Sequence, residues 1–486
     1  MDHFDEAQSL NYGHGMADGL KIGAPGQAAA SVRSLPARFD RLFNLPAHVE
    51  TDNKLPKMNP AAIDAIFQEV GKPGGVMDEA VVPGSGFEST IPAGYTFLGQ
   101  FIDHDITLEL RSKLAVLNPV LMADLQNTRT PDLDLDSVYG LGPDAAPYLY
   151  QQTAGNKAKF LIGESRTGAG QTFADLPRNR ENVALIGDPR NDENTVISQL
   201  HLAFLKFHNK LVDQLKAQGT SGDKDLFEAA YKHVIYYYHK VIIDDFLPRI
   251  IGSELLNDLL SPTSPRKPRY YIETDPTKMY MPVEFSGAAY RYGHSQVRES
   301  YIFTDQIKGR IFDFSPTPAQ GPTAFVQWKY FFEMDPTARP VPSRVLDTRL
   351  PTQLLKLPFI TDGLTSLVTR NLMRGRVLGL PSGQTIAQQM VADGLIPASQ
   401  KLPVSNDLKA WMDETPLWFY ILQEAKELGG GNRLGPVGGR IVGEVIVGLM
   451  KQNPYSVLNT TFSPVINLPT SNGKFLMPNL LTVALG

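Results

Sequence analysis

Residues 194–219 read NTVISQLHLAFLKFHNKLVDQLKAQG, a stretch with the apolar spacing of a long buried helix. Its apolar side chains recur at steps of three and four residues: Ile197, Leu200, Phe204, Phe207, Leu211 and Leu215. Such steps place them on one face of an α-helix. Gly219 provides a stop signal at the end of the pattern.

A second long pattern of this period spans residues 224–252, and shorter ones predict helices at 61–71, 362–375, 384–394, 416–428 and 438–450. Strand-like alternation is scarce, and nothing repeats at a fixed period. We therefore predict a mainly α fold with long loops and few short strands. Residues 1–57 are rich in Gly, Pro and polar residues, which predicts an extended N-terminal arm. Residues 58–486 are expected to form a single domain.

The composition limits the class of function. Hydrophobic residues make up 42% of the chain and charged residues 20%, values typical of a globular protein with a sizeable core. The net charge of −5 implies no basic surface, so we expect neither nucleic acid nor anionic membrane as a partner. The chain has no cysteine, which excludes disulfide-linked oligomers, thiolate catalysis and thiolate metal sites. Any cofactor must be held by histidine, carboxylate or backbone oxygen.

No segment of the sequence predicts a membrane span. The N-terminus lacks a basic region followed by an apolar run, so no secretory signal is visible. The apolar stretch at 438–452 is interrupted by Glu444 and is too short to cross a bilayer. We expect a soluble chain, cytoplasmic or exported by a non-classical route.

Residues 99–107, GQFIDHDIT, place one histidine between two acids within an apolar run. In a helix over 95–110, Gln100 and His104 would share a face, about 40° apart, with Asp103 beside them. Asp105 would point about 160° away from Asp103. We therefore expect two directions: Gln100, His104 and Asp103 towards one pocket, and Asp105 towards another site.

Residues 129–140, RTPDLDLDSVYG, alternate oxygen-bearing side chains at Thr130, Asp132, Asp134 and Asp136. Calcium takes six to eight oxygen ligands and suits such a loop, although the glycine and terminal glutamate of an EF-hand are missing. A solvated acidic turn is the ordinary interpretation of this loop alone. Asp105 of the preceding motif also needs a partner. When it is considered together with this loop, a calcium site becomes the favoured interpretation.

Three further motifs follow. GDPRNDENTVISQL (187–200) places Arg190 before the long helix and Glu193 in its first turn. A carboxylate commonly occurs at this place because it interacts favourably with the helix dipole. AAYRYGHSQV (288–297) contains His294, and a lone histidine of this kind is usually a core residue. TRNLMRGRVLGLPSGQ (369–384) contains Asn371 and Arg374.

Taken together and in this order, the five motifs resemble the animal-type haem peroxidases, the superfamily of myeloperoxidase and lactoperoxidase, in a cysteine-free form of the bacterial type. The resemblance covers residues 90–450. It implies the helical haem-peroxidase fold with haem b and calcium as cofactors. It also implies reduction of hydrogen peroxide and oxidation of halides, thiocyanate or small aromatic donors through ferryl haem intermediates.

The resemblance implies a role for each matching residue. His104 would be the distal histidine, Gln100 the halide- and peroxide-binding position, and Arg190 the distal arginine. His294 would bind the haem iron and Asn371 would hydrogen-bond its ring. The other implied haem contacts are the propionate partners Arg291 and Arg374 and the ester-forming Asp103 and Glu193. The implied calcium ligands are Asp105, Thr130, the carbonyl of Asp132, Asp134 and Asp136.

The sequence departs from the resemblance at two places, and one further position bears on the substrate. Asn194 stands where myeloperoxidase has the methionine that forms a sulfonium link, so that bond is excluded. Val377 and Leu378 replace an Asp-His pair that follows RGR in the family. Cyclooxygenases place a radical-forming tyrosine three residues before the axial histidine, and Arg291 at this position argues against a fatty-acid dioxygenase.

Two other functions remain alternatives. The HD pair also occurs in metal-dependent phosphohydrolases, which need further histidine ligands. The histidines available for this role lie on apolar helices and are more typical of packing: His201, His208, His233 and His239. The second alternative is a calcium-stabilised binding protein without catalysis. Against it, the motif residues of a haem site are all present.

Overall fold

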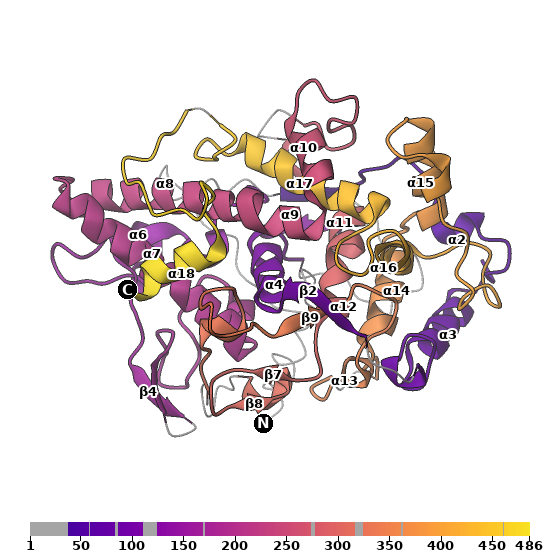
Figure 1. The fold of residues 1–486 in the computed structure, drawn as a ribbon, viewed down its shortest axis with the longest axis horizontal. Helices are drawn as coiled ribbons and strands as arrows, with labels where there is room; N and C mark the ends of the chain where they lie inside the picture. Colours follow the sequence, from indigo (N-terminus) through magenta and orange to yellow (C-terminus); the bar gives the residue numbers. More distant parts are fainter. Residues whose placement is uncertain are drawn as a thin grey trace.

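The structure is a computed structural model, and it describes residues 37–57, 59–82, 86–109, 124–168, 171–273, 278–315, 324–360, 363–459 and 461–486. It confirms the mainly α fold with few short strands (Figure 1). The helices are α2 (His48–Thr51), α3 (Pro60–Gly71), α4 (Gly94–Ile106), α5 (Asp136–Tyr139), α6 (Gly142–Ala145), α7 (Thr195–Ala217), α8 (Asp223–Val241), α9 (Leu247–Ile250), α10 (Ser253–Leu260), α11 (Val283–Gly287), α12 (Gly293–Gln296), α13 (Thr352–Leu355), α14 (Leu367–Val377), α15 (Gly383–Ala392), α16 (Leu417–Glu427), α17 (Pro436–Gln452) and α18 (Met477–Leu485).

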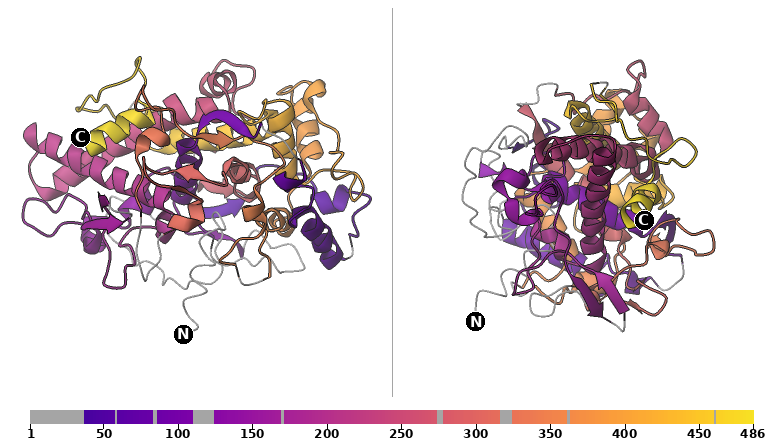
Figure 2. Two further views of the ribbon diagram at one scale, coloured as in Figure 1. Left: turned by 60° about the horizontal axis from the view of Figure 1, so that its bottom comes forward. Right: turned by 90° about the vertical axis from the view of Figure 1, so that its left-hand side faces the viewer.

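The predicted long helix is α7, and it packs most extensively against α8 and α18. It begins at the predicted place because the side chain of Asn194 accepts hydrogen bonds from the backbone amides of Val196 (3.1 Å) and Ile197 (3.0 Å). These bonds satisfy two of the donors that every helix leaves unpaired at its start. The α7, α8 and α18 group lies at the opposite end of the molecule from α3 (Figure 2).

The predicted helix over 224–252 is divided. α8 ends at Val241, a π-helical turn spans Ile242–Phe246, and α9 follows. Pro248 lies in the first turn of α9 and has no amide hydrogen to continue the ladder. In the wider turn, Asp245 accepts hydrogen bonds from the Tyr95 hydroxyl and, at 2.9 Å each, from Arg249 and the Met477 amide. These side-chain bonds explain why the helix widens here.

Helix α4 lies at the centre of the molecule and carries GQFIDHD (Figure 1). The aromatic ring of Phe101 in this helix stacks on that of Phe204 in α7, with the ring centroids 4.6 Å apart. The helix ends at Ile106, before the predicted residue 110, because the Asn127 side chain bonds both the Ile106 carbonyl and the Leu108 amide at 2.8 Å. Those groups are thereby taken out of the helical ladder.

The remaining helices that shape the site surround α12. Helix α14 packs on α3, and α16 packs on both α14 and the 3₁₀ turn Ala289–Tyr292. Trp418 of α16 donates a hydrogen bond to the carbonyl of Arg291 at 3.1 Å. The chain that precedes α12 is therefore held rigidly. Among the helices described, none combines the length and the apolar character needed to cross a bilayer.

The strands are short: β1 (Ala37–Asp40), β2 (Glu88–Pro92), β3 (Gln126–Asn127), β4 (Ser165–Gly168), β5 (Gln171–Ala174), β6 (Tyr280–Pro282), β7 (Tyr301–Ile302), β8 (Lys308–Gly309) and β9 (Pro342–Arg344). Strand β1 joins β3 antiparallel and β6 parallel. The predicted arm therefore contains residues that pair with the body, and the amides of Leu42 and Phe43 also donate to Glu284 of α11. The part of the arm at 1–36 lies outside the described residues.

Candidate active site

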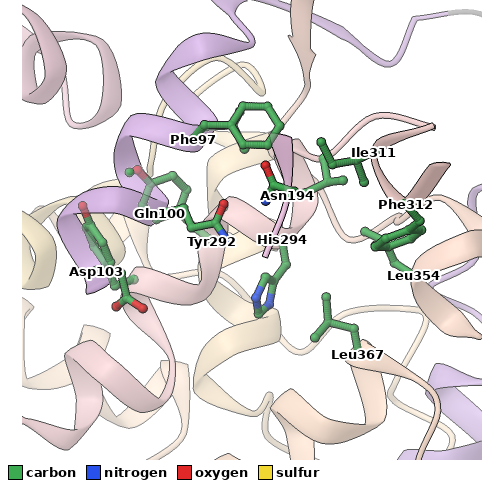
Figure 3. Close-up of a pocket in the computed structure, with 15 residues that line it drawn as sticks. Phe97, Gln100, Asp103, Asn194, Tyr292, His294, Ile311, Phe312, Leu354 and Leu367 are labelled. Atoms are coloured by element: carbon green, nitrogen blue, oxygen red, sulfur yellow. The ribbon is translucent and has the colours of Figure 1, made fainter. Parts of the chain in front are cut away.

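A cavity lies between α4 and the segment that leads into α12. The cavity and its mouth together enclose about 730 Å³ of space not occupied by protein atoms, part of which is open to solvent. Gln100 and Asp103 of α4 and His294 of α12 are its principal polar residues (Figure 3). Its apolar wall is formed largely by Phe97, Ile311, Phe312, Leu354 and Leu367.

His294 is buried and its imidazole ring extends into this cavity (Figure 3). Asn371 of α14 lies behind the ring, with its Nδ2 2.7 Å from Nδ1 of His294. Oδ1 of the same amide accepts a hydrogen bond from Nη1 of Arg291 at 3.3 Å. The structure therefore brings together His294 and Asn371, two residues that lie far apart in the sequence and that the resemblance pairs.

The orientation of the Asn371 amide differs from the expected one. The resemblance predicts that its oxygen accepts a hydrogen bond from His294, whereas the structure places its nitrogen there. An amide nitrogen can only donate, so Nδ1 of His294 is the acceptor in this arrangement and the ring proton lies on Nε2. A 180° turn of the amide reverses both roles and moves the proton to Nδ1, the tautomer that a metal ligand at Nε2 requires.

The residues of α4 divide into two directions, as the helical geometry predicts. Gln100 and Asp103 line the cavity, and Asp105 points to a separate group of acids. His104 was expected to face the same pocket, but it is buried and is not among the residues that line the cavity wall. Its Nδ1 instead lies 2.8 Å from Oδ1 of Asn191.

Asn191 is a residue that the sequence analysis missed. Its Oδ1 accepts from Nδ1 of His104, and its Nδ2 lies 3.0 Å from Nδ1 of His201. This arrangement keeps the proton of the His104 ring on Nδ1 and the lone pair on Nε2. The only sequence signal was its place next to Arg190, because the two ends of the bond are 87 residues apart.

Arg190 is buried and lies against the backbone of α4. Its Nη2 donates to the carbonyls of His104 (3.0 Å) and Thr107 (2.8 Å), and its Nε and Nη2 bond the carboxylate of Asp188. Burial alone would raise the pKa of Asp188, but the guanidiniums of Arg129 and Arg190 outweigh it and hold that pKa well below its usual range. Arg190 and Asp188 thus form a permanently charged pair next to His104.

Glu193 and Asn194 follow this pair. Glu193 accepts a hydrogen bond from Nε2 of Gln100, and its Oε2 is buried with no hydrogen-bond partner among the described residues. Burial raises the pKa of Glu193 well above its usual value, although the nearby Arg190 opposes this shift. Asn194 lines the cavity while it caps α7. Gln100 therefore joins Glu193 to the cavity wall.

The second direction of α4 leads to an acidic cluster, defined here as Asp105, Asp134 and Asp136. One carboxylate oxygen from each lies within 4.8 Å of the other two. Thr130 donates to Asp134 at 2.9 Å, and Oδ1 of Asp105 has no hydrogen-bond partner in the part of the chain that is described. Burial, followed by repulsion from Asp136, raises the pKa values of Asp105 and Asp134 well above normal. Such crowding of buried carboxylates is costly without a cation.

Asp132 lies at the edge of this cluster. Its backbone carbonyl, the atom that the resemblance assigns to calcium, accepts a hydrogen bond from Nδ2 of Asn453 at 3.1 Å. A carbonyl oxygen has a second lone pair, so this bond leaves it able to bind a cation as well. The side chain of Asp132 is half-buried and is not one of the three clustered carboxylates.

Comparison with known proteins assigns this chain to a family. The sequence profile described as animal haem peroxidase matches residues 121–391, more than half of the chain. The chain belongs to the animal haem peroxidase family. The matched range contains Arg190, His294 and Asn371, whereas α4 lies before it. Family membership implies haem and oxidoreductase chemistry.

Curated members of the family are distant relatives of this chain. Thyroid peroxidase from Sus scrofa is 26% identical over 281 residues, which are 52% of this chain and 29% of that protein. Thyroid peroxidase from Canis lupus familiaris is 29% identical over 284 residues, 52% of this chain and 29% of that protein. Chorion peroxidase from Aedes aegypti is 28% identical over 265 residues, 50% of this chain and 31% of that protein. The matches thus span less than a third of these relatives.

Solved structures with a similar fold include two kinds of protein. Peroxidase A from Dictyostelium discoideum has a TM-score of 0.60 at 17% identity and covers 92% of this chain and 96% of its own. A fatty acid alpha-dioxygenase from Oryza sativa has a TM-score of 0.60 at 13% identity, with 91% and 78% covered. At these identities the likeness concerns the haem peroxidase fold alone.

The cavity fits the haem that the animal haem peroxidase family implies. Its apolar walls suit a porphyrin, and an imidazole, the common axial ligand of haem iron, extends into it. The two arginines assigned to haem propionates are buried and do not line the cavity wall. Nε of Arg291 donates to the Ser286 carbonyl at 2.8 Å, and burial lowers the pKa of Arg291 to about 10. Arg374 lies on α14, on the same helix as Asn371.

Four other histidines were candidates for a hydrolytic metal site, and the structure places them in packing roles. His208 contacts the Ala158 carbonyl and His239 the Leu133 carbonyl, both at 2.8 Å, and His233 contacts its own helix. Within the described ranges, only the acidic cluster groups three potential metal ligands. The geometry of these histidines therefore does not favour a phosphohydrolase.

Proposed function

We propose that this protein is a haem-dependent peroxidase that reduces hydrogen peroxide and oxidises halides, thiocyanate or small aromatic donors. The observation that carries the proposal is the pairing of two groups across one cavity. His294, backed by Asn371, extends into the cavity from one side, and α4 presents Gln100 and Asp103 on the other. A bound haem would supply the redox chemistry, taking two oxidising equivalents from peroxide and passing them to a donor.

The residues of the chain have separate tasks in this proposal. His294 would hold the iron, and Asn371 would fix the plane of its ring. His104, with its proton held on Nδ1 by Asn191, has a basic Nε2 that can take a proton from peroxide and return it to the leaving oxygen. Arg190, the distal arginine that the resemblance implies, donates to the carbonyls of His104 and Thr107 and would hold the end of α4 that carries His104.

Steady-state turnover tests the proposal. Purified, haem-loaded protein is supplied with hydrogen peroxide and, separately, with chloride, bromide, iodide, thiocyanate and a phenol. Turnover of at least one donor class is expected. Haem uptake without turnover of any of them would leave a non-catalytic binding protein as the better function. A fatty-acid dioxygenase is disfavoured because position 291 carries a guanidinium bonded to Ser286 and Asn371 rather than a phenol.

Asn191 offers the first specific prediction. Asn191→Leu removes the acceptor that fixes the His104 tautomer, so the rate constant for reaction with peroxide should fall about ten- to a hundredfold. Asn191→Asp keeps an acceptor at the same place, so its rate constant should fall less. The measurement is stopped-flow absorbance at equal haem content. A leucine variant that reacts as fast as the wild type would remove Asn191 from the mechanism.

We also propose that the acidic cluster binds calcium. Hard oxygen ligands, a buried unpaired oxygen on Asp105 and strong mutual repulsion favour a divalent cation. The ligands would be the three clustered carboxylates, Thr130 and the carbonyl of Asp132.

Calcium removal gives the second prediction. A cation that binds only the folded state stabilises it by about 2.7 kcal/mol at a hundredfold excess over Kd. A chelator should therefore lower Tm by several degrees, and added calcium should restore it. Asp134→Asn should lose this response, whereas Asp132→Asn, which keeps the backbone carbonyl, should retain it. An equal response to calcium in Asp134→Asn and wild type would contradict the site.

Asp103 and Glu193 are proposed to form ester bonds to haem methyl groups, each with loss of one methyl C–H bond and with hydrogen peroxide as the two-electron oxidant, so the haem-loaded protein is treated with peroxide before the test. Asp103 lines the cavity, and the buried Oε2 of Glu193 is available for such a bond. Mass spectrometry after acid–acetone extraction tests the links. Haem that leaves freely with an unmodified mass would refute them.

A further inference from the structure

Arg129 connects the acidic cluster to the residues beside His104. Its Nη1 lies 3.5 Å from Oδ1 of Asp136, a member of the cluster. On its other side, Nη2 and Nε of the same guanidinium contact Oδ2 of Asp188 at 2.6 and 3.0 Å. Nη2 also donates to the Gly187 carbonyl at 3.2 Å. One planar side chain thus contacts a carboxylate of each group.

The connection continues from Asp188 into α4. Arg190 binds the same Asp188 carboxylate through Nε and Nη2, and that Nη2 also donates to the carbonyls of His104 and Thr107. The order of contacts is therefore Asp136, Arg129, Asp188, Arg190 and the backbone of His104. This path is separate from the covalent one that joins Asp105 to His104 along α4.

The charges along this path balance only when a divalent cation is counted. The three carboxylates of the acidic cluster and that of Asp188 face the guanidiniums of Arg129 and Arg190, which leaves two negative charges when all are ionised. Asp188 is fully buried, and the Arg129 side chain is 11% exposed. Solvent therefore screens the interactions among these charges poorly. Each guanidinium divides its contacts between neighbouring carboxylates according to the charge that each carboxylate carries.

We propose that Arg129 is a positioning residue that couples cation binding in the acidic cluster to the placement of Arg190 and His104 through Asp188. With a cation present, Asp136 is neutralised and Arg129 stays on Asp188. Without the cation, the uncompensated negative charge of the acidic cluster attracts Arg129 towards Asp136. Asp188 then loses one of its two arginine partners, and its hydrogen bonds to Arg190 change. This inference rests on the proposed function.

Cyanide affinity measures the coupling without turnover. Cyanide binds ferric haem on the face that peroxide would use, so its Kd reports the placement of His104 and Arg190. The haem-loaded protein is titrated by absorbance in saturating calcium and in chelator. We expect Kd in the wild type to change about fivefold or more between the two conditions. In Arg129→Gln the change should fall below about twofold, and Arg129→Lys, which keeps the charge, should recover part of it.

Arg178→Gln is the matched control. Arg178 is also largely buried, with 3% of its side chain exposed against 11% for Arg129, and it too pairs with two aspartates, Asp175 and Asp192. Asp192 lies in the same turn as Arg190, but among the described residues no hydrogen bond or ion pair joins Arg178 to the acidic cluster. It should keep the full calcium dependence. An Arg129→Gln protein with wild-type calcium dependence, or an Arg178→Gln protein that loses it too, would overturn the proposal.

The remaining outcomes are also decisive. If Arg129→Gln does not fold, the calcium dependence of cyanide binding is measured in Arg129→Lys instead. A dependence smaller than that of the wild type supports the proposal, and an undiminished dependence overturns it. A wild type that takes up haem but shows no calcium effect on cyanide binding refutes the coupling alone. A wild type that takes up no haem refutes the proposed function instead.

Discussion

Replacing His294 by glycine should abolish stable haem binding, the largest effect that the structure predicts. The imidazole of His294 is the only histidine ring in the wall of the described cavity, and the chain has no cysteine. Loss of the axial ligand should weaken haem affinity by about a hundredfold or more. Haem titration followed by the Soret band measures this loss.

Imidazole rescue separates ligand loss from misfolding. The glycine variant leaves a space the size of the missing ring, so added imidazole should restore the Soret band of a histidine-ligated haem. His208→Gln is the control, because His208 is equally buried but bonds Tyr139 and Ala158 away from the cavity. It should bind haem like the wild type. A glycine variant with an unchanged spectrum and affinity would show that another group holds the iron.

The helices were predictable because their signals are local. Apolar periodicity identified α7 from its own residues, and the Gly219 stop marked its end within a few residues. The ends of other helices depended on distant groups. α4 ends where Asn127 takes over its backbone, and the segment after Val241 widens where Asp245 binds Tyr95 and Met477. No periodicity encodes such contacts.

The candidate site shows the same division. Alternating acids and the helical angle of Asp105 predicted the acidic cluster, which the structure assembles. The sequence did not reveal that Arg129, one residue before the loop's first oxygen, turns towards Asp188, 59 residues away. Nor could it reveal that Asn191 pairs with His104. Both depend on how the turn Pro189–Asp192 packs against α4, which is a property of the assembled fold.

His104→Leu should slow the reaction with hydrogen peroxide by about a hundred- to ten-thousandfold while haem stays bound. Leucine fills a similar volume but can neither take the peroxide proton nor return it. Haem binding should survive because His294, the residue that would hold the iron, and its partner Asn371 are unchanged. Stopped-flow absorbance at equal haem content gives the second-order rate constant.

His201→Leu is the matched control for this prediction. His201 bonds the same amide, Asn191, but from the side away from His104. Burial lowers the pKa of His201 to about 3, so its ring is neutral at assay pH and its loss changes no charge. The control should therefore react within a few-fold of the wild type. If His201→Leu slowed the reaction as much as His104→Leu, packing around Asn191 rather than proton transfer by His104 would explain the loss. If His104→Leu kept the wild-type rate, a different residue would have to be the base, and the carboxylates of Asp103, which lines the cavity, and Glu193, which accepts from Gln100, would be the next groups to replace.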